Sequence, residues 1–293
     1  MTGVQTCALP ICGVYGYGIN QLKPWVLSIN EVCDENVDKI MCISNISEET
    51  KNWLIEQGFG LIDMPRAAIN QIPVHVLRFL SIFHYLRDTY KDYKYVITTD
   101  VKDVYFQKNP FQHMEELLKD TDKKLIAGSE GMIYKDEPWG DRNLMEAYGP
   151  YVYDLVKDSE IYNVGTIAGY SEYVKDLVFN IFTNAVNRPI PIVDQAVYNV
   201  LLNTQPYKDT TLFLKQESGW AMQAGTTADP SKIKSFRPFL TEAEPVFEDG
   251  IVRTNQKLDF TIVHQYDRVP EWKKFVMKRY KQEDESEYFT YRT

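Results

Sequence analysis

The sequence has few cysteines and no long uninterrupted apolar run. Its four cysteines, at positions 7, 12, 33 and 42, are too few and too N-terminal to form a disulfide framework, so we expect free thiols. No stretch approaches the roughly 20 apolar residues of a transmembrane helix. No basic flank leads into an apolar segment at the N-terminus, as it would in a signal peptide. We therefore expect a cytoplasmic protein without a transmembrane segment.

The sequence also has fewer basic than acidic residues. The chain has 32 lysines and arginines against 41 aspartates and glutamates, which gives a formal net charge of -9. Such a surface repels nucleic acid and anionic membranes, so we expect neither as a partner. An anionic ligand would need local help from a bound cation, a single arginine or a helix N-terminus.

The first twelve residues, MTGVQTCALPIC, resemble a translated sequencing adapter. We therefore expect residues 1–12 to be a non-native leader that has overwritten part of the first strand, of which residues 14–17 remain. Residues 13–281 should form one α/β domain, and the polar residues 282–293 should form a frayed tail. A hydrophobic content of 44% suffices for a core in a chain of this length.

Apolar runs typical of strands alternate with amphipathic helical segments through the first half of the chain. This pattern predicts a mostly parallel, Rossmann-like sheet with helices on both faces. Residues 74–86 should form a buried helix with Arg78 in its middle. A buried arginine is costly without a partner, so we expect an acidic neighbour such as Asp100. Asn45, with Glu48 three residues later, predicts a capping box for a helix that ends at Gly58.

The second half of the chain is less regular. A loop rich in glycine, glutamate and tryptophan should follow a short strand at residues 125–127. Further strands and helices are expected, with the strands at residues 161–168, 211–214 and 261–263 and the helices at residues 143–148, 151–156, 172–186 and 194–203.

Two carboxylates follow the strand expected at residues 95–99. Asp100 and Asp103 stand where open α/β sheets bind ligands, and a turn at Val101 and Lys102 would bring them together. Convergent carboxylates are ligands for Mg²⁺ or Mn²⁺, although two such acids alone are more often solvated loop residues. His264 follows another β-branched run and could deliver an imidazole to the same cation.

Four segments together carry a resemblance to a known family. They are YVITTDVKDVYFQKNPF at residues 95–111, Asn163-Val164-Gly165, Asp194-Gln195 and VHQY at residues 263–266. In sequence and in order they resemble the motifs of GT-A nucleotide-diphospho-sugar transferases, in particular a family distantly similar to glycogenin. The resemblance spans roughly residues 18–278, and the order of motifs is more specific than any single one.

This resemblance implies roles for individual residues. Asp100 would lie near the donor ribose and the metal, and Asp103 and His264 would bind Mn²⁺ or Mg²⁺ directly. Arg78 would lie near the donor diphosphate or Asp100. The residues facing the transferred sugar would be Asn163, Asp194 and Gln195. The acidic motif here has two residues between its carboxylates where the family has one, so the division of roles between Asp100 and Asp103 stays open.

Other polar and aromatic residues are candidates for ligand contacts. Lys273 belongs to a loop that could close over a phosphate, together with Gln265, Asp267, Arg268 and Trp272. Glu130, Glu137, Trp139 and Glu217 fall in irregular segments where an acceptor would dock, and Trp139 could stack on a sugar ring or simply pack. Gly219-Trp220 is consistent with only a turn and a packed ring.

The sequence therefore favours a metal-dependent glycosyltransferase, hexosyltransferase-like and of EC class 2.4. It would move a sugar from a nucleotide-diphosphate donor to a glycan or other hydroxyl-bearing acceptor. One alternative is a nucleotidyl or phosphoryl transferase, which should show a glycine-rich loop with a lysine after the first strand. The other is a non-catalytic protein that binds sugar nucleotides or glycans.

Overall fold

The computed structural model describes residues 6–34, 37–65 and 71–282. In this part of the chain a seven-stranded sheet has the order β3-β2-β1-β4-β7-β6-β8. Strand β7 is antiparallel to both neighbours, and the other adjacent pairs are parallel. The strands are β1 (Thr6–Tyr15), β2 (Lys39–Ser44), β3 (Phe59–Asp63), β4 (Tyr93–Thr99), β6 (Leu125–Ile133), β7 (Glu160–Tyr170) and β8 (Thr211–Leu214).

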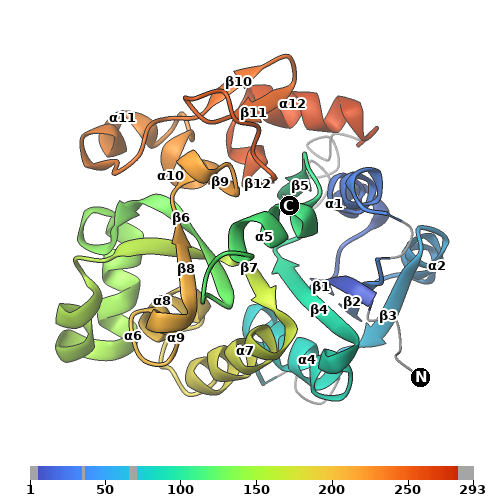
Figure 1. Cartoon of the computed structure of the whole chain (residues 1–293), viewed down its shortest axis with the longest axis horizontal. Helices are drawn as coiled ribbons and strands as arrows, with labels where there is room; N and C mark the ends of the chain where they lie inside the picture. The colour runs from blue at the N-terminus through green and yellow to red at the C-terminus, as the bar shows by residue number, and fades with distance from the viewer. Residues whose placement is uncertain (1–5, 35–36, 66–70, 283–293) are drawn as a thin grey trace, which may run out of the picture.

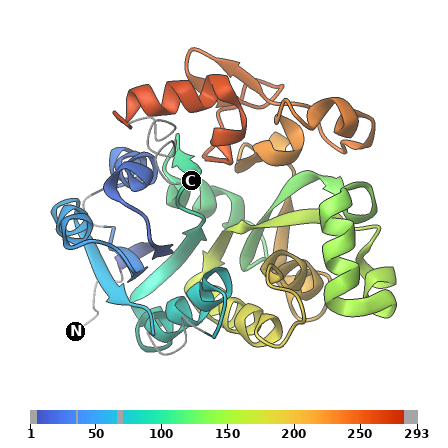
Figure 2. The ribbon, with the colours of Figure 1, turned by 180° about the vertical axis from the view of Figure 1, so that it is seen from behind.

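Helices cover both faces of this sheet, as Figures 1 and 2 show from opposite sides. One face packs against α1 (Ile19–Val32), α2 (Glu48–Glu56) and α5 (Pro110–Leu118). The other face packs against α4 (Val74–Thr89), α6 (Pro138–Val156), α7 (Ser171–Ala185) and α8 (Asp194–Leu202). No helix in the described ranges is both long and apolar enough to cross a membrane.

The alternation of strand side chains separates the two cores. In β4, Val96 packs with α4 and α7, whereas Tyr95 and Ile97 pack with α1 and α5. In β1, Leu9 and Ile11 face the core formed with α4 and α7. Ala8, Cys12 and Val14 face the core formed with α1 and α5. Successive strand residues point to opposite faces, so a strand between two helical layers must be apolar on both sides.

A three-stranded sheet lies beyond the carboxyl end of β4. Its strands β5 (Val104–Phe106), β12 (Ile262–His264) and β9 (Ala221–Gln223) lie in the order β5-β12-β9. Strand β12 is antiparallel to β5, and its register sets His264 opposite Val104, directly after Asp103. The rest of this region, visible at the top of Figures 1 and 2, comprises α10 (Ala224–Thr227), α11 (Ile233–Phe236), the ribbon of β10 (Val246–Glu248) and β11 (Ile251–Arg253), and α12 (Pro270–Arg279).

The predicted architecture, a single α/β domain with a mostly parallel sheet between helices, is confirmed, but two local predictions are wrong. The first strand is not limited to residues 14–17, because β1 begins at Thr6 and buries residues of the suspected leader. The boundary at residue 13 stays a prediction, and residues 283–293 of the expected tail lie outside the described residues. The cap of α2 is Ser47, whose hydroxyl accepts from the Thr50 N–H at 3.1 Å, while Asn45 has a φ of 54°. The free thiols expected at Cys12, Cys33 and Cys42 are present.

Candidate active site

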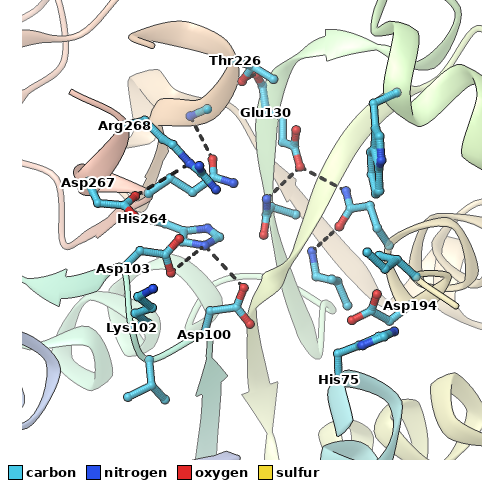
Figure 3. A pocket seen from close by; sticks show the side chains of 18 of the residues that line it. His75, Asp100, Lys102, Asp103, Glu130, Asp194, Thr226, His264, Asp267 and Arg268 are labelled. Carbon is cyan, nitrogen blue, oxygen red and sulfur yellow. Dashed lines mark hydrogen bonds and ion pairs between the residues drawn. The ribbon is translucent and has the colours of Figure 1, made fainter. Parts of the chain in front are cut away.

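A cavity of about 790 Å³ opens at the carboxyl ends of β1 and β4. Because β7 is antiparallel to β4, its amino-terminal half lies at this same edge and contributes Asn163 and Val164. The three-stranded sheet closes one side and the start of α8 the other (Figure 3). Open α/β sheets bind ligands at this edge.

Asp100, Asp103 and His264 converge in this cavity. The turn expected at residues 101–102 is present, and one ligand atom from each of the three side chains lies within 4.8 Å of the others. The Nε2 atom of His264 is 3.5 Å from Asp100 Oδ2 and 3.6 Å from Asp103 Oδ1 (Figure 3). The backbone N–H of Gln265 donates to the Asp103 carbonyl at 2.7 Å, which ties the two ligand-bearing segments together.

The orientation of His264 favours a metal ligand. Its ring is buried, with 2% exposure, and its Nδ1 lies 2.7 Å from Oε1 of Gln223. The Gln223 amide donates from Nε2 to the Thr166 hydroxyl at 3.2 Å, so its Oε1 is free to accept. With Nδ1 placed to donate to Gln223, Nε2 is the ring nitrogen that faces the two carboxylates, and its lone pair would be available to a bound cation. Among the described residues this buried Nε2 has no hydrogen-bond partner.

The charges in the cluster are strongly coupled. Burial lowers the pKa of His264, but the carboxylates of Asp103 and Asp100 outweigh it and raise that pKa overall. Burial raises the pKa of Asp103. The pKa of Asp100 is lowered despite burial, because Arg78 and His264 stabilise its charge. Two close carboxylates with one orphaned imidazole nitrogen need a positive charge between them, and a divalent cation fits this donor set.

Arg78 links this cluster to the start of α8. Its side chain is 13% exposed and pairs with Asp100, as expected, and also with Asp194 at 3.3 Å. Burial raises the pKa of Asp194, although the Arg78 charge opposes this. The helix carrying Arg78 passes so close to β1 that a Cβ at Gly13 would lie 2.6 Å from the Arg78 Cβ. Arg78 thus holds two carboxylates of the cavity, those of Asp100 and Asp194, in place.

Glu130 occupies the opposite wall of the cavity. It does not lie in an irregular loop as expected, because β6 runs through it. Asn163 donates from Nδ2 to Glu130 Oε1 at 2.7 Å, and Gln195 donates from Nε2 to the same oxygen at 3.0 Å (Figure 3). Burial raises the pKa of Glu130 to about 7, and the charge of Glu137 acts in the same direction. The two amides expected to face a sugar thus hold a half-buried carboxyl group.

The remaining candidates differ in whether they line the cavity and are free to contact a ligand. Trp139 lines the cavity and is 46% exposed, so its ring is available to a ligand. Glu137 also lines it, but its carboxylate caps α6 by accepting from the Gly140 N–H at 2.6 Å. Glu217 is exposed and lies outside the cavity lining, and Trp220 is a packed ring with 1% exposure.

Lys273 is not brought to the cavity. It is exposed on α12, outside the lining, while the neighbouring Trp272 is buried against Phe247. The helical spacing of α12 explains this, because Trp272 and Val276 turn inward and Lys273 must then face solvent. Gln265, Asp267 and Arg268 do line the cavity, as expected of that loop.

Several lining residues carried no recognised signal in the sequence. Tyr15 is the last residue of β1, Tyr17 follows that strand, and Lys102 stands between the two metal-binding candidates. Thr226 and Lys232 come from the region of α10 and α11. Lys102 could have been found from its place in the acidic motif, whereas Thr226 and Lys232 reach the cavity only through the tertiary fold.

Comparisons with known proteins identify the fold. Neither the models of known protein families nor the curated proteins include a match. Among solved structures the chain is similar to the apo structure of the bifunctional glycosyltransferase WbbM, with a TM-score of 0.56, 14% identity and 97% of this chain covered. It spans about half of that protein, 53% of its length. It is also similar to the galactosyltransferase LgtC, solved with donor and acceptor sugar analogues, with a TM-score of 0.51, 13% identity and 87% of this chain and 86% of that chain covered. The chain therefore has the fold of the GT-A glycosyltransferases.

Proposed function

We propose that this protein is a metal-dependent glycosyltransferase that moves a sugar, most simply a hexose, from a nucleotide-diphosphate donor to a hydroxyl group of an acceptor glycan. The observation that carries the proposal is the Asp100, Asp103 and His264 cluster, with a buried, unpartnered His264 Nε2, at the mouth of a large cavity in a GT-A fold.

The three side chains of the cluster would hold Mn²⁺ or Mg²⁺. One imidazole with two carboxylates suits Mn²⁺ particularly well. When bound, the cation supplies positive charge that stabilises the nucleotide diphosphate as a leaving group. The role of the protein is to fix the ligands, and the Gln223 contact to His264 Nδ1 and the Arg78 pairing of Asp100 serve that purpose.

The donor nucleotide would lie along the end of β1. Tyr15 is 38% exposed at the cavity, so its ring could stack on the base, and Tyr17 lies beside it. Lys102 and Arg268 line the cavity on either side of the metal cluster and could contact the diphosphate. These two basic side chains would supply the local positive charge that an anionic donor needs in a chain of net charge -9.

The transferred sugar would lie between the metal cluster and Glu130, close to Asp194, Gln195 and Asn163. With its pKa near 7, Glu130 could exchange a proton with the acceptor hydroxyl as that oxygen attacks the anomeric carbon. Asn163 and Gln195 fix the carboxyl group from one side. The exposed ring of Trp139 offers the acceptor a stacking surface.

In the part of the chain that the structure describes, the lysine that a phosphoryl or nucleotidyl transferase would carry after its first strand does not line the cavity. The first lysine after β1 is Lys23, whose Nζ donates to the Lys281 carbonyl at 2.8 Å. It is not among the residues that line the cavity. This observation favours sugar transfer over the phosphate-transfer alternative.

Calorimetric titration of UDP and GDP tests the proposal. We expect one nucleotide to bind in the presence of Mn²⁺ and binding to disappear with chelator. Asp103→Ala and His264→Ala should each weaken the metal-dependent binding by about 100-fold, the effect of losing a metal ligand or its support. Lys273→Ala, outside the cavity, is the matched control and should bind as the wild type does.

The alternatives predict other outcomes. Nucleotide binding by well-folded protein that is equally strong with chelator would contradict the metal site. Binding without transfer to any acceptor, and without slow hydrolysis of the donor sugar, would favour the non-catalytic binding protein. No binding to either nucleotide would overturn the assignment of these donors.

A further inference from the structure

A second pocket, of about 350 Å³, lies near the carboxyl end of β6, where Gly131 approaches the side chains of Gln216 and Glu242. We call it the rear pocket. It shares no lining residue with the main cavity. The lining residues that matter here are Gln216, Thr241, Glu242, Thr254, Asn255 and Gln256.

Buried polar groups in the rear pocket lack partners. Gln216 is 3% exposed, and neither its side-chain nitrogen nor its side-chain oxygen has a hydrogen bond within the described residues. The Glu242 carboxyl group interacts with the Ser129 side chain, and its Oε2 accepts from the Gln216 backbone N–H, but its buried Oε1 has no hydrogen-bond partner at good distance and angle within the described residues. Nearly all buried polar groups in proteins are satisfied, so three unsatisfied atoms in one pocket call for a ligand.

The rear pocket adjoins Glu130 of the main cavity through the next residue, Gly131. Gly131 has a φ of 69°, and its carbonyl accepts from the Thr241 N–H at 2.8 Å. A Cβ at Gly131 would lie 3.1 Å from the Gln216 Nε2 atom. The main cavity and the rear pocket are therefore neighbours at Glu130–Gly131.

The chemistry of the rear pocket suits a neutral hydroxylated ligand. The Gln216 amide offers two donors and an acceptor, and the Glu242 carboxyl group lies beside it. Asn255 and Gln256 add amides at the exposed rim. An anion is disfavoured, because Glu217 and Glu242 both line the pocket and Lys215 is 3.5 Å from Glu160.

The size of the rear pocket exceeds what a few ordered waters need. A water molecule takes about 30 Å³ of liquid volume, whereas small-molecule sites begin at about 300 Å³. We propose that the rear pocket is a second carbohydrate-binding site, for a sugar unit of monosaccharide size whose hydroxyl groups pair with Gln216 and Glu242.

The test is an NMR titration of the full chain with the methyl glycosides of glucose, galactose and N-acetylglucosamine. It uses an Asp103→Ala background, in which the proposed donor site is disabled. We expect at least one glycoside to shift the amide signals of Gln216, Thr241 and Asn255. Gln216→Met, similar in shape, should weaken that binding by about tenfold or more. Gln112→Met, on the exposed side of α5, is the control and should not change it.

Glu242→Gln provides a second variant should Gln216→Met not fold, and it should also weaken binding. The proposal is overturned if no glycoside shifts these amides, or if the shifts persist unchanged in both variants. Signals that move only around Trp139 and Glu130 would assign the sugar to the main cavity and would overturn it as well. Nucleotide titrations do not enter these outcomes, so failure of the proposed transferase activity would leave this result standing.

Discussion

At Gly165 the backbone passes close to the Asp100, Asp103 and His264 cluster. A Cβ there would lie 2.7 Å from His264 Cε1 and 2.8 Å from Asp100 Oδ2, closer than real side chains approach. The backbone carbonyl of Gly165 also accepts from the Asp100 N–H at 2.9 Å. The glycine of the Asn163-Val164-Gly165 motif is therefore required by the packing of the metal ligands themselves.

Gly165→Ala should abolish metal-dependent nucleotide binding, or weaken it by about 100-fold, because the methyl group displaces His264 or Asp100. Calorimetry with Mn²⁺ measures the effect, and circular dichroism checks the fold. Gly18→Ala is the matched control, since a Cβ at Gly18 meets nothing within 4 Å. Unchanged Mn²⁺-dependent binding in Gly165→Ala would contradict the placement of the cation.

Glu130 should make the stability of the protein depend on pH. Its pKa is about 7 in the fold, against 4.5 ordinarily, so the folded state holds an extra proton between these values. The contribution of Glu130 to stability therefore falls as pH rises from about 4.5 to 7, by up to about 3 kcal/mol. Glu130→Gln keeps an oxygen for Asn163 and Gln195 but cannot titrate.

The wild type should lose stability as pH rises from about 4.5 to 7, and Glu130→Gln should not. We therefore expect the free energy of unfolding of Glu130→Gln to increase relative to that of the wild type over this pH range. Urea unfolding at pH 5 and pH 8, with chelator present, measures the difference. Parallel pH profiles for the two proteins would show that Glu130 is ionised in the fold at its ordinary pKa.

The sequence predicted the metal cluster more fully than the other side chains of the cavity. Asp100 and Asp103 come after one β-branched run and His264 follows another, and that local signal is visible without a structure. Glu130 was misplaced because β6 contains Gly128 and Gly131 and its pairing with β7 shifts register around Ser129. Such a bulged strand resembles a loop in sequence. Lys273 was misplaced because the inward face of α12 is set by tertiary packing.

At the scale of elements, strands and helices with a strong local pattern were predicted to within a few residues. Strand β8 matches its expected bounds, and the expected gap between two helices at residues 149–150 is a kink within α6, where Gly149 has a φ of 74° and Pro150 follows. The direction of β7 could not be predicted, because periodicity is the same in parallel and antiparallel strands.

Mutagenesis can decide which residue caps the N-terminus of α2, Ser47 or Asn45. Ser47 satisfies a first-turn N–H of this helix, whereas Asn45, in the left-handed region, does not cap it. Ser47→Ala should lower the free energy of unfolding by about 1 kcal/mol, measured by urea denaturation. Asn45→Gly should cost far less, because glycine favours that backbone conformation. The reverse order of the two effects would restore Asn45 as the cap.

At the scale of the whole molecule, the metal cluster joins two distant parts of the chain. Asp100 and Asp103 follow the main sheet, and His264 belongs to the three-stranded sheet packed beyond it. A cation that binds only the folded protein stabilises it by mass action, by about 2.7 kcal/mol at 100 times its dissociation constant.

Thermal unfolding should therefore shift upward with Mn²⁺ in the wild type and return with chelator. His264→Ala should lose the shift, while Lys273→Ala, our control outside the cavity, should keep it. An equal shift in wild type and His264→Ala would mean that the stabilising cation binds elsewhere.

The separation of the metal ligands along the chain also orders events during synthesis. The carboxylates of Asp100 and Asp103 leave the ribosome long before His264, whose strand β12 follows every other strand of the two sheets that meet at the cavity. A nascent chain can build β1 to β4 and expose both acids, yet it has no imidazole to complete the cluster. The proposed cation site is thus assembled only after the polypeptide has been made through residue 264, so unfinished chains would lack one of its three side chains.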